Sequence, residues 1–395
     1  MDYIQKGTKD FRKTNLALFA AGFITFANLY STQAVLPEFT KEFHISPALA
    51  SLSLSFATFA LAISLVIFGS LSEAWGRKQL MTLSIVSASI LTLAIAFSPS
   101  FELLLILRVI QGIAFAGLPA IAMAYLGEEV DAKSLGVAMG LYISGNSVGG
   151  LAGRIIMGTM TDLFSWKVGM IFLGLLSIVI SVYFIVALPK SKHFEPRKLQ
   201  FKSLVSSLLA HLKNPGMLCL FGIGFTLMAS FVSLYNYISF KLLDPPYSLS
   251  TTIVGWIFII YLVGTFSSTW FGSLADRYGR PRVLIAGIII MFAGGLITLD
   301  VHLVLKIAGI TIFTFGFFGA HSIASGWVSH RATHDKAQAS SLYLFFYYFG
   351  SSIGGTAAGV FWSKFGWGGV IGLIAFFLLG AIVLSYSLRH FFVRE

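Results

Sequence analysis

Twelve apolar runs take up most of this chain, and each approaches the roughly 20 residues that a helix needs to cross a bilayer. Charged residues make up only 11% of the 395 residues, against about 25% in a typical soluble domain. The sequence therefore predicts an all-α membrane protein with twelve transmembrane helices. The predicted spans are 15–36, 50–71, 79–98, 102–126, 135–160, 167–188, 216–240, 252–272, 283–301, 303–329, 338–362 and 367–388.

The basic residues in the loops predict the orientation of these spans, because Lys and Arg collect in cytoplasmic loops. With the N-terminus inside, 20 of the 27 basic residues fall on the cytoplasmic side, 5 fall outside, and Arg108 and Arg154 lie within spans. Both termini are therefore predicted to be cytoplasmic. The densest basic cluster lies in the polar stretch 190–213 and comprises Lys190, Lys192, Arg197, Lys198, Lys202 and Lys213.

The chain is internally duplicated. The stretch "GSLSEAWGRK" at 69–78, between spans two and three, returns as "GSLADRYGRP" at 272–281, between spans eight and nine. The stretch "GNSVGG" in span five has a counterpart "GSSIGG" in span eleven. We therefore predict two six-helix bundles, 1–189 and 214–395, joined by a cytoplasmic linker at 190–213. Two parallel repeats of this kind occur in one large class of secondary transporters.

These motifs resemble those of the major facilitator superfamily, and the resemblance covers the whole chain. The two ten-residue stretches resemble the family's loop motif, with Glu73 where the motif usually has Asp. The stretch "LRVIQG" around Arg108 resembles the family's motif in span four. "GNSVGG" resembles the glycine motif of the twelve-span drug/proton antiporter group, although Asn146 stands where that motif has Pro. The resemblance implies two pseudo-symmetric bundles that work by alternating access.

The resemblance also implies a conformational latch at the two loop motifs. Gly76 and Gly279 would permit tight turns, while Arg77, Lys78 and Arg280 would anchor at the membrane interface. The alternative is a solvated turn whose charges only set the topology. The residues assigned to the latch are Gly69, Glu73, Gly76, Arg77, Lys78, Gly272, Asp276, Gly279 and Arg280.

Two arginines lie inside predicted spans. An Arg at this depth costs about 2.5–3.5 kcal/mol even on the lenient insertion scale, so each should face a water-filled cavity or a partner. Arg108 is expected to bind an anionic substrate group or to tune a proton carrier; the alternative is a paired cation that locks two helices. Arg154 is expected near Arg108, with snorkelling toward Asp162 as its alternative. The candidate carboxylates near these two cations are Glu38, Glu102 and Asp162.

Proton coupling needs a titratable group, yet none of the 16 acidic residues lies near the middle of a predicted span. This disfavours permanent cations as substrates and favours zwitterionic, anionic or neutral amphipathic solutes. His321 lies near the expected midplane and titrates near physiological pH. It is a candidate proton carrier together with Arg108, Glu38 and Asp162, or else a histidine that packs helices.

The remaining candidates form two groups. The first is expected to line a substrate cavity, with an aromatic belt and inter-helix hydrogen bonds as the alternative; besides Arg108, Arg154 and His321 it comprises Asn28, Tyr30, Gln33, Tyr142, Tyr235, Asn236, Tyr237, Tyr343 and Tyr347. The second is expected to let helices approach closely and to pack spans five and eleven against the opposite half; it comprises Gly145, Asn146, Gly149, Gly150, Gly153, Gly350 and Gly354.

The sequence shows no catalytic constellation, nucleotide-binding loop or metal-ligand spacing, so we expect neither an enzyme nor a metal or cofactor. The basic residues stand in short clusters, which argues against a nucleic-acid partner. The expected partners are a small-molecule solute, protons and the lipid bilayer, for a monomer in the cell membrane, a bacterial inner membrane. The leading hypothesis is proton-coupled export of small amphipathic molecules; the rival is an uptake symporter or an anion exchanger.

Overall fold

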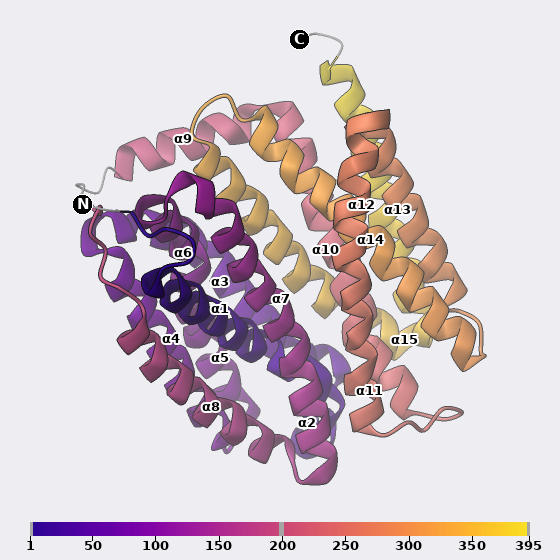
Figure 1. Cartoon of the computed structure of the whole chain (residues 1–395). Coiled ribbons are helices and arrows are strands. Elements are labelled where there is room, and N and C mark those ends of the chain that lie inside the picture. The colour runs from indigo at the N-terminus through magenta and orange to yellow at the C-terminus, as the bar shows by residue number, and fades with distance from the viewer. Residues whose placement is uncertain (1–2, 197–200, 393–395) are drawn as a thin grey trace. The chain divides into compact units, whose positions relative to one another are not determined.

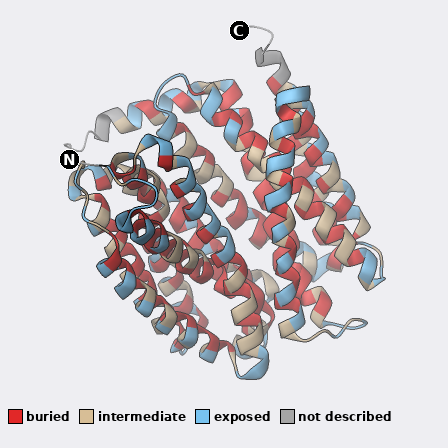
Figure 2. Ribbon diagram, viewed as in Figure 1, coloured by how far each residue is buried: buried red, intermediate tan, exposed pale blue. Residues whose placement is uncertain are grey.

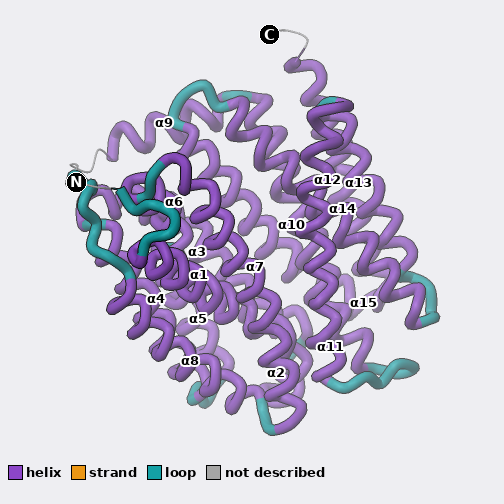
Figure 3. The backbone as a smooth tube through the Cα atoms, in the orientation of Figure 1, coloured by secondary structure: helices purple, strands orange, loops and turns teal. Residues whose placement is uncertain are grey.

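The computed structural model describes residues 3–196 and 201–392 and is built from helices joined by short loops (Figures 1 and 3). In chain order the elements are α1 (Lys9–Tyr30), η1 (Ser31–Val35), α2 (Leu36–Phe43), α3 (Pro47–Trp75), α4 (Arg77–Ala96), α5 (Phe101–Phe115), α6 (Gly117–Glu129), α7 (Ala132–Leu163), α8 (Trp166–Ala187), α9 (Phe201–Lys213), α10 (Pro215–Leu243), α11 (Thr251–Ile257), η2 (Phe258–Tyr261), α12 (Leu262–Tyr278), α13 (Arg280–Ile297), α14 (Leu303–Arg331) and α15 (Lys336–Phe392).

Helices occupy all twelve predicted spans. Within the described residues, nine helical stretches are long and apolar enough to cross a membrane, where α5 with α6 and α11 to α12 each count as one. α15 contains a non-helical Gly366 with φ 60° and thus comprises two spans. The more polar α1 and α7 supply the other two. Figure 2 shows buried residues on the helix faces turned toward neighbouring helices and exposed residues on the outer faces.

The chain folds into two compact units. Unit 1 comprises Met1–Glu38, Phe56–Gln200 and Ser250–Trp256, and unit 2 comprises Phe39–Ser55, Phe201–Leu249 and Ile257–Glu395. The predicted division into 1–189 and 214–395 stays a prediction. Part of the predicted linker is the helix α9, whose buried Ser207 and His211 lie four residues apart on one face. Arg197 and Lys198 of the linker lie outside the described residues.

In unit 1, a row of glycines on α7 lets its backbone touch that of α1. A Cβ added at Gly145, Gly149 or Gly153 would overlap the carbonyl oxygen of Phe19, Phe23 or Ala27, respectively. Successive contacts are four residues apart on both helices, so one face of α7 follows one face of α1 over two turns.

Unit 2 repeats this arrangement with α15 on α10. A Cβ added at Gly350 would overlap the carbonyl oxygen of Phe225, and one added at Gly354 would overlap the backbone of Ala229. These glycines thus make their close contacts within their own sequence half. Span eleven does contact the first half, but at Ser352, whose Oγ donates to the carbonyl oxygen of Ser55 at 2.7 Å. Asn146 lies in the same α1–α7 contact, where a Cβ at Gly22 would overlap its side-chain oxygen.

We predict that Gly149→Ala destabilises the protein by roughly 1–3 kcal/mol, the usual cost of overpacking a filled contact. The matched control is Gly140→Ala on the same helix, because a Cβ there meets nothing within 4 Å and Ala favours a helix over Gly by about 1 kcal/mol. Thermal unfolding of both variants in one detergent would check this. Equal midpoints for the two variants would contradict the packing role.

Candidate functional site

Arg108 binds the backbone of α1 in the interior of unit 1. Its side chain is fully buried. Its Nη1 donates to the carbonyl oxygen of Asn28 at 3.2 Å, and its Nη2 donates to that of Leu29 at 2.7 Å. These carbonyls lie where α1 ends and the 3₁₀ turn η1 begins. Arg108 therefore ties α5 to the change of helix type in the first span, as in the helix-locking alternative.

A polar network extends this contact to α4. Arg108 Nη1 also donates to Gln111 Oε1 at 2.7 Å, and Gln111 Nε2 donates to Thr92 Oγ1 at 2.8 Å. On the other side of the network, Asn28 Nδ2 donates to Ser177 Oγ of α8 at 2.8 Å. The buried cation thus belongs to a chain of hydrogen bonds that joins helices α1, α4, α5 and α8.

Arg154 approaches the same part of α1 from α7. Its Nε donates to Gln33 Oε1 at 2.7 Å, its Nη1 donates to the carbonyl oxygen of Gly150 at 2.6 Å, and its Cζ lies 4.1 Å from the centre of the Tyr30 ring. The side chain is 2% exposed. Arg108 and Arg154 therefore converge on residues 28–33, as predicted. The snorkelling alternative is wrong, because Arg154 turns back toward Gly150 and away from Asp162.

The candidate carboxylates lie at helix ends. Glu38 is in the first turn of α2 and half-buried, and Glu102 is in the first turn of α5 and exposed. Asp162 lies near the end of α7, where its Oδ2 accepts a hydrogen bond from Thr252 Oγ1 at 2.7 Å. Of these three, Glu38 is half-buried and the other two are exposed.

In unit 2, His321 lies among aromatic rings. A hydrogen bond of 2.9 Å joins His321 Nδ1 to Tyr343 Oη. The imidazole stacks on Phe317 with centroids 5.7 Å apart and planes 3° apart, and the Tyr347 ring lies 4.7 Å away. The side chain of Tyr343 packs against Gly224 of α10. The structure thus brings together three of the predicted site residues, His321, Tyr343 and Tyr347.

Other predicted lining residues are held by contacts between helices of their own unit. Tyr235 Oη is 2.7 Å from Thr314 Oγ1, and Tyr237 Oη donates to the carbonyl oxygen of Gly355 at 2.8 Å. Asn236 between them is buried and lies against Gly355. Tyr142 belongs to the hydrophobic core of unit 1. These residues fit the alternative of inter-helix packing better than that of a cavity lining.

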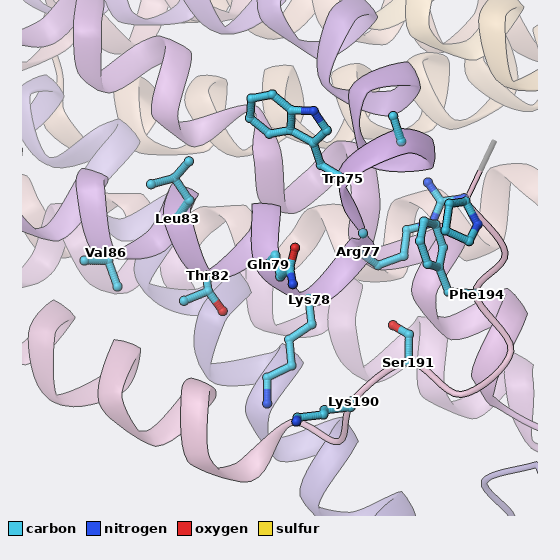
Figure 4. Close-up of a pocket in the computed structure, with 13 residues that line it drawn as sticks. Trp75, Arg77, Lys78, Gln79, Thr82, Leu83, Val86, Lys190, Ser191 and Phe194 are labelled. Atoms are coloured by element: carbon cyan, nitrogen blue, oxygen red, sulfur yellow. The ribbon is translucent and has the colours of Figure 1, made fainter. Parts of the chain in front are cut away.

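The first loop motif is held by an ion pair. Both motif glycines adopt the left-handed backbone of a tight turn, with φ 98° at Gly76 and 85° at Gly279. Arg77 was expected at the interface but is buried, and its Nη2 lies 2.6 Å from Glu128 Oε1 at the end of α6. The Cζ atom of Arg77 also lies 5.5 Å from the centre of the Phe194 ring, and Figure 4 shows these two side chains next to each other. Arg77 therefore binds a protein carboxylate, and its role as an anchor at the membrane interface stays a prediction.

The second loop motif has different surroundings. Glu128 follows Arg77 by 51 residues, and the residue at the same separation from Arg280 is a cation, Arg331. The guanidinium of Arg331 packs against Gly216 at the start of α10. The residue at this separation in the second half is therefore not a carboxylate that could pair with Arg280. The motif acidic residues Glu73 and Asp276 are both exposed.

Comparisons with known proteins agree with this architecture. The sequence pattern of the Major Facilitator Superfamily matches residues 18–245 and 240–393. The chain belongs to the Major Facilitator Superfamily. It is 56% identical to the uncharacterized MFS-type transporter YybF of Bacillus subtilis (strain 168), with 98% of this chain and 95% of YybF covered. It is 44% identical to the inner membrane transport protein YnfM of Escherichia coli (strain K12), with 98% and 93% covered.

Among solved structures, the fold is similar to that of a bacterial homologue of the human lysosomal transporter Spinster. The TM-score is 0.78 at 17% sequence identity, with 98% of this chain and 99% of the other covered. As a superfamily member with such relatives, the protein is a multi-pass transporter of the cell membrane. Its assignment to the drug/proton antiporter group stays a prediction.

Sequence reasoning overlooked Glu128 and Glu129 at the end of the fourth span. Glu129 is buried and accepts hydrogen bonds from the backbone N–H groups of Lys192 and His193, at 2.7 and 2.9 Å. Two adjacent carboxylates after an apolar run were the available signal. Glu128 thus holds the first loop motif to the end of α6, and Glu129 holds the 190–196 segment there.

We predict that Arg77→Gln destabilises the protein by roughly 1.5–3 kcal/mol, the range for hydrogen bonds to charged groups, because Glu128 loses its partner. Arg280→Gln, the matched change in the second motif, should cost less. Unfolding of Arg77→Gln, Glu128→Gln and the double variant forms a cycle that isolates the pair. Strictly additive effects would show that the ion pair contributes nothing.

Proposed function

We propose that this protein is a secondary active transporter that works by alternating access and exports small amphipathic solutes, zwitterionic or anionic, in exchange for protons. The observation that supports this proposal best is the surroundings of Arg154. A cation, an amide and an aromatic ring meet there at the 3₁₀ turn of the first span. These groups match the charged end, polar part and apolar part of an amphipathic solute.

A solute can replace the present contacts of Arg154 more easily than those of Arg108. Arg108 binds backbone carbonyls of α1, which cannot leave without unwinding the helix. Arg154 binds the side chain of Gln33 and the face of Tyr30, and both can rotate away. A carboxylate or phosphate can accept two N–H groups of a guanidinium at once and adds an opposite charge, which the amide of Gln33 lacks. We therefore assign Arg154 to the solute and Arg108 to the support of α1.

His321 is the proposed proton carrier. Its partner Tyr343 Oη can either donate or accept a hydrogen bond. The neutral imidazole and the imidazolium can therefore both keep the contact at Nδ1. The rings of Phe317, Tyr343 and Tyr347 pack around the imidazole, and aromatic faces attract a cation. A proton can thus be gained and lost here without breaking the surrounding structure.

Access to these groups requires a conformational change. Arg154 is 2% exposed, so a solute cannot reach its guanidinium in this conformation. A 3₁₀ stretch within a helix often marks a hinge, and η1 lies directly beside Arg154. We propose that movement of one unit relative to the other, with bending at η1, opens the site to each side of the membrane in turn.

A second candidate function is uptake symport or anion exchange. The observation that favours it is the convergence of two buried arginines on residues 28–33, because two cations suit an anionic solute. Purified protein in vesicles, a solute panel and an imposed pH gradient separate the candidates. Export driven by an inward proton gradient supports the first, co-directional uptake supports symport, and solute exchange without any proton gradient supports the anion exchanger.

We predict that Arg154→Gln remains folded but lowers transport of anionic solutes at least tenfold, since a buried charge-assisted contact contributes about 1.5–3 kcal/mol. Arg154→Lys should restore part of the rate. Arg108→Gln should instead lower the unfolding midpoint, because two hydrogen bonds from the guanidinium to α1 carbonyls are lost, although Ser31 still donates to that of Asn28. Native transport by Arg154→Gln would exclude this residue from the solute site.

We predict that His321→Ala flattens the pH dependence of transport while solute binding changes little. Glu38→Gln and Asp162→Asn are tested in the same vesicles, because both acids lie at helix ends. Tyr343→Phe is measured alongside, because it removes the hydroxyl that is hydrogen-bonded to His321 Nδ1 and keeps the aromatic ring. If the pH dependence of transport is unchanged in His321→Ala but lost in one of the two acid variants, that carboxylate is the proton site.

A further inference from the structure

A cavity in unit 1 lies beside the first loop motif and shares no residue with the candidate solute site around Arg154. It has a volume of about 830 Å³, within the range of about 300–1,000 Å³ typical of small-molecule sites. It is lined by the end of α3, the first turns of α4 and the segment that follows α8 (Figure 4). The residues that line it are Ala74, Trp75, Gly76, Arg77, Lys78, Gln79, Thr82, Leu83, Val86, Lys190, Ser191, Phe194 and Pro196.

The lining carries three cations and no carboxylate. Arg77 is engaged with Glu128, which leaves the ammonium groups of Lys78 and Lys190 to set the charge of the cavity. Figure 4 shows these two side chains reaching toward the same region, and they lie close enough to repel one another. An anion between them would relieve this repulsion. Ser191 and Thr82 supply hydroxyl groups beside it.

Lys78 is held in place by the structure. Its Nζ donates to the carbonyl oxygens of Ile185 and Leu188 at the end of α8, at 2.8 and 2.5 Å. The side chain therefore has little freedom left to lose when an anion binds. Two carboxylates, Glu73 and Glu195, are exposed next to lining residues in the sequence but do not line the cavity. A third, Glu129, is engaged with the backbone of Lys192 and His193.

The mouth of the cavity is apolar. Trp75 is 59% exposed and Leu83 57% exposed, and Val186 on the adjoining end of α8 is 80% exposed. Such side chains on membrane-spanning helices face lipid, and Trp is enriched at the level of the head groups. A ligand with an anionic head and apolar chains would fit the basic interior and the apolar rim together.

We propose that this cavity binds the phosphate-bearing head group of an anionic phospholipid, with its acyl chains against Trp75 and Leu83. Basic pockets between transmembrane helices at the cytoplasmic side are known to take such head groups, and the predicted topology places this end of unit 1 in the inner leaflet. The bound lipid would bridge the first loop motif and the 190–196 segment.

The test uses the full chain in phosphatidylcholine vesicles that contain a minor fraction of phosphatidylglycerol, with bromine on the acyl chains of one lipid at a time. Bromine quenches nearby tryptophan. The chain has 7 tryptophans, so the signal of Trp75 is the difference between the native protein and Trp75→Phe. The ratio of quenching by the two lipids reports the preference for the anionic head group at this site.

We expect a preference for phosphatidylglycerol that falls roughly fivefold in Lys190→Gln and again in the double variant with Lys78→Gln. Lys192→Gln is the matched control, an exposed lysine on the same segment outside the cavity, and should keep the preference. If Lys78→Gln fails to fold because α8 loses its donor, Lys190→Gln alone decides.

Three results would overturn the proposal. The first is equal quenching by the two lipids in the native protein. The second is an equal loss in Lys192→Gln and Lys190→Gln, which would mean that general surface charge attracts the lipid. The third is loss of the preference when inorganic phosphate is added at constant ionic strength, which would make the occupant a soluble anion.

Discussion

A guanidinium buried at membrane depth must be hydrogen-bonded, and Arg108 meets this requirement by binding the first span where its helix type changes. Without those donors, the carbonyls of Asn28 and Leu29 would lose polar partners where water is scarce. The contact fixes the position of residues 28–33. The meeting of Gln33 and Tyr30 with Arg154 follows from it, so the candidate solute site depends on a cation that never needs to touch the solute.

The two units share the same helix packing but carry different polar side chains. In both, a row of glycines brings the backbones of the first and fifth helices of a repeat into contact, α1 with α7 and α10 with α15. The side chains around this common frame differ. Unit 1 carries the arginine network, and unit 2 carries His321 among aromatic rings. Duplication thus preserved the helix packing, which tolerates little change, while the polar groups diverged.

The two loop motifs have likewise diverged in their electrostatics. Arg77 has a carboxylate partner, whereas the residue 51 positions after Arg280 is another cation, Arg331. Opposite charges hold the first motif to α6, and Arg331 cannot supply the same ion pair to Arg280.

The sequence by itself determined the twelve spans, the duplication and the glycine turns, because apolar length, repeated letters and the need for positive φ are local properties. It also marked Arg108, Arg154 and His321, because a polar group in an apolar run is conspicuous. Only the tertiary structure decided their partners. Arg108 and Asn28 are 80 residues apart, and Arg154 and Gln33 are 121 apart. No periodicity specifies such pairs, which arise when packed helices bring distant side chains together.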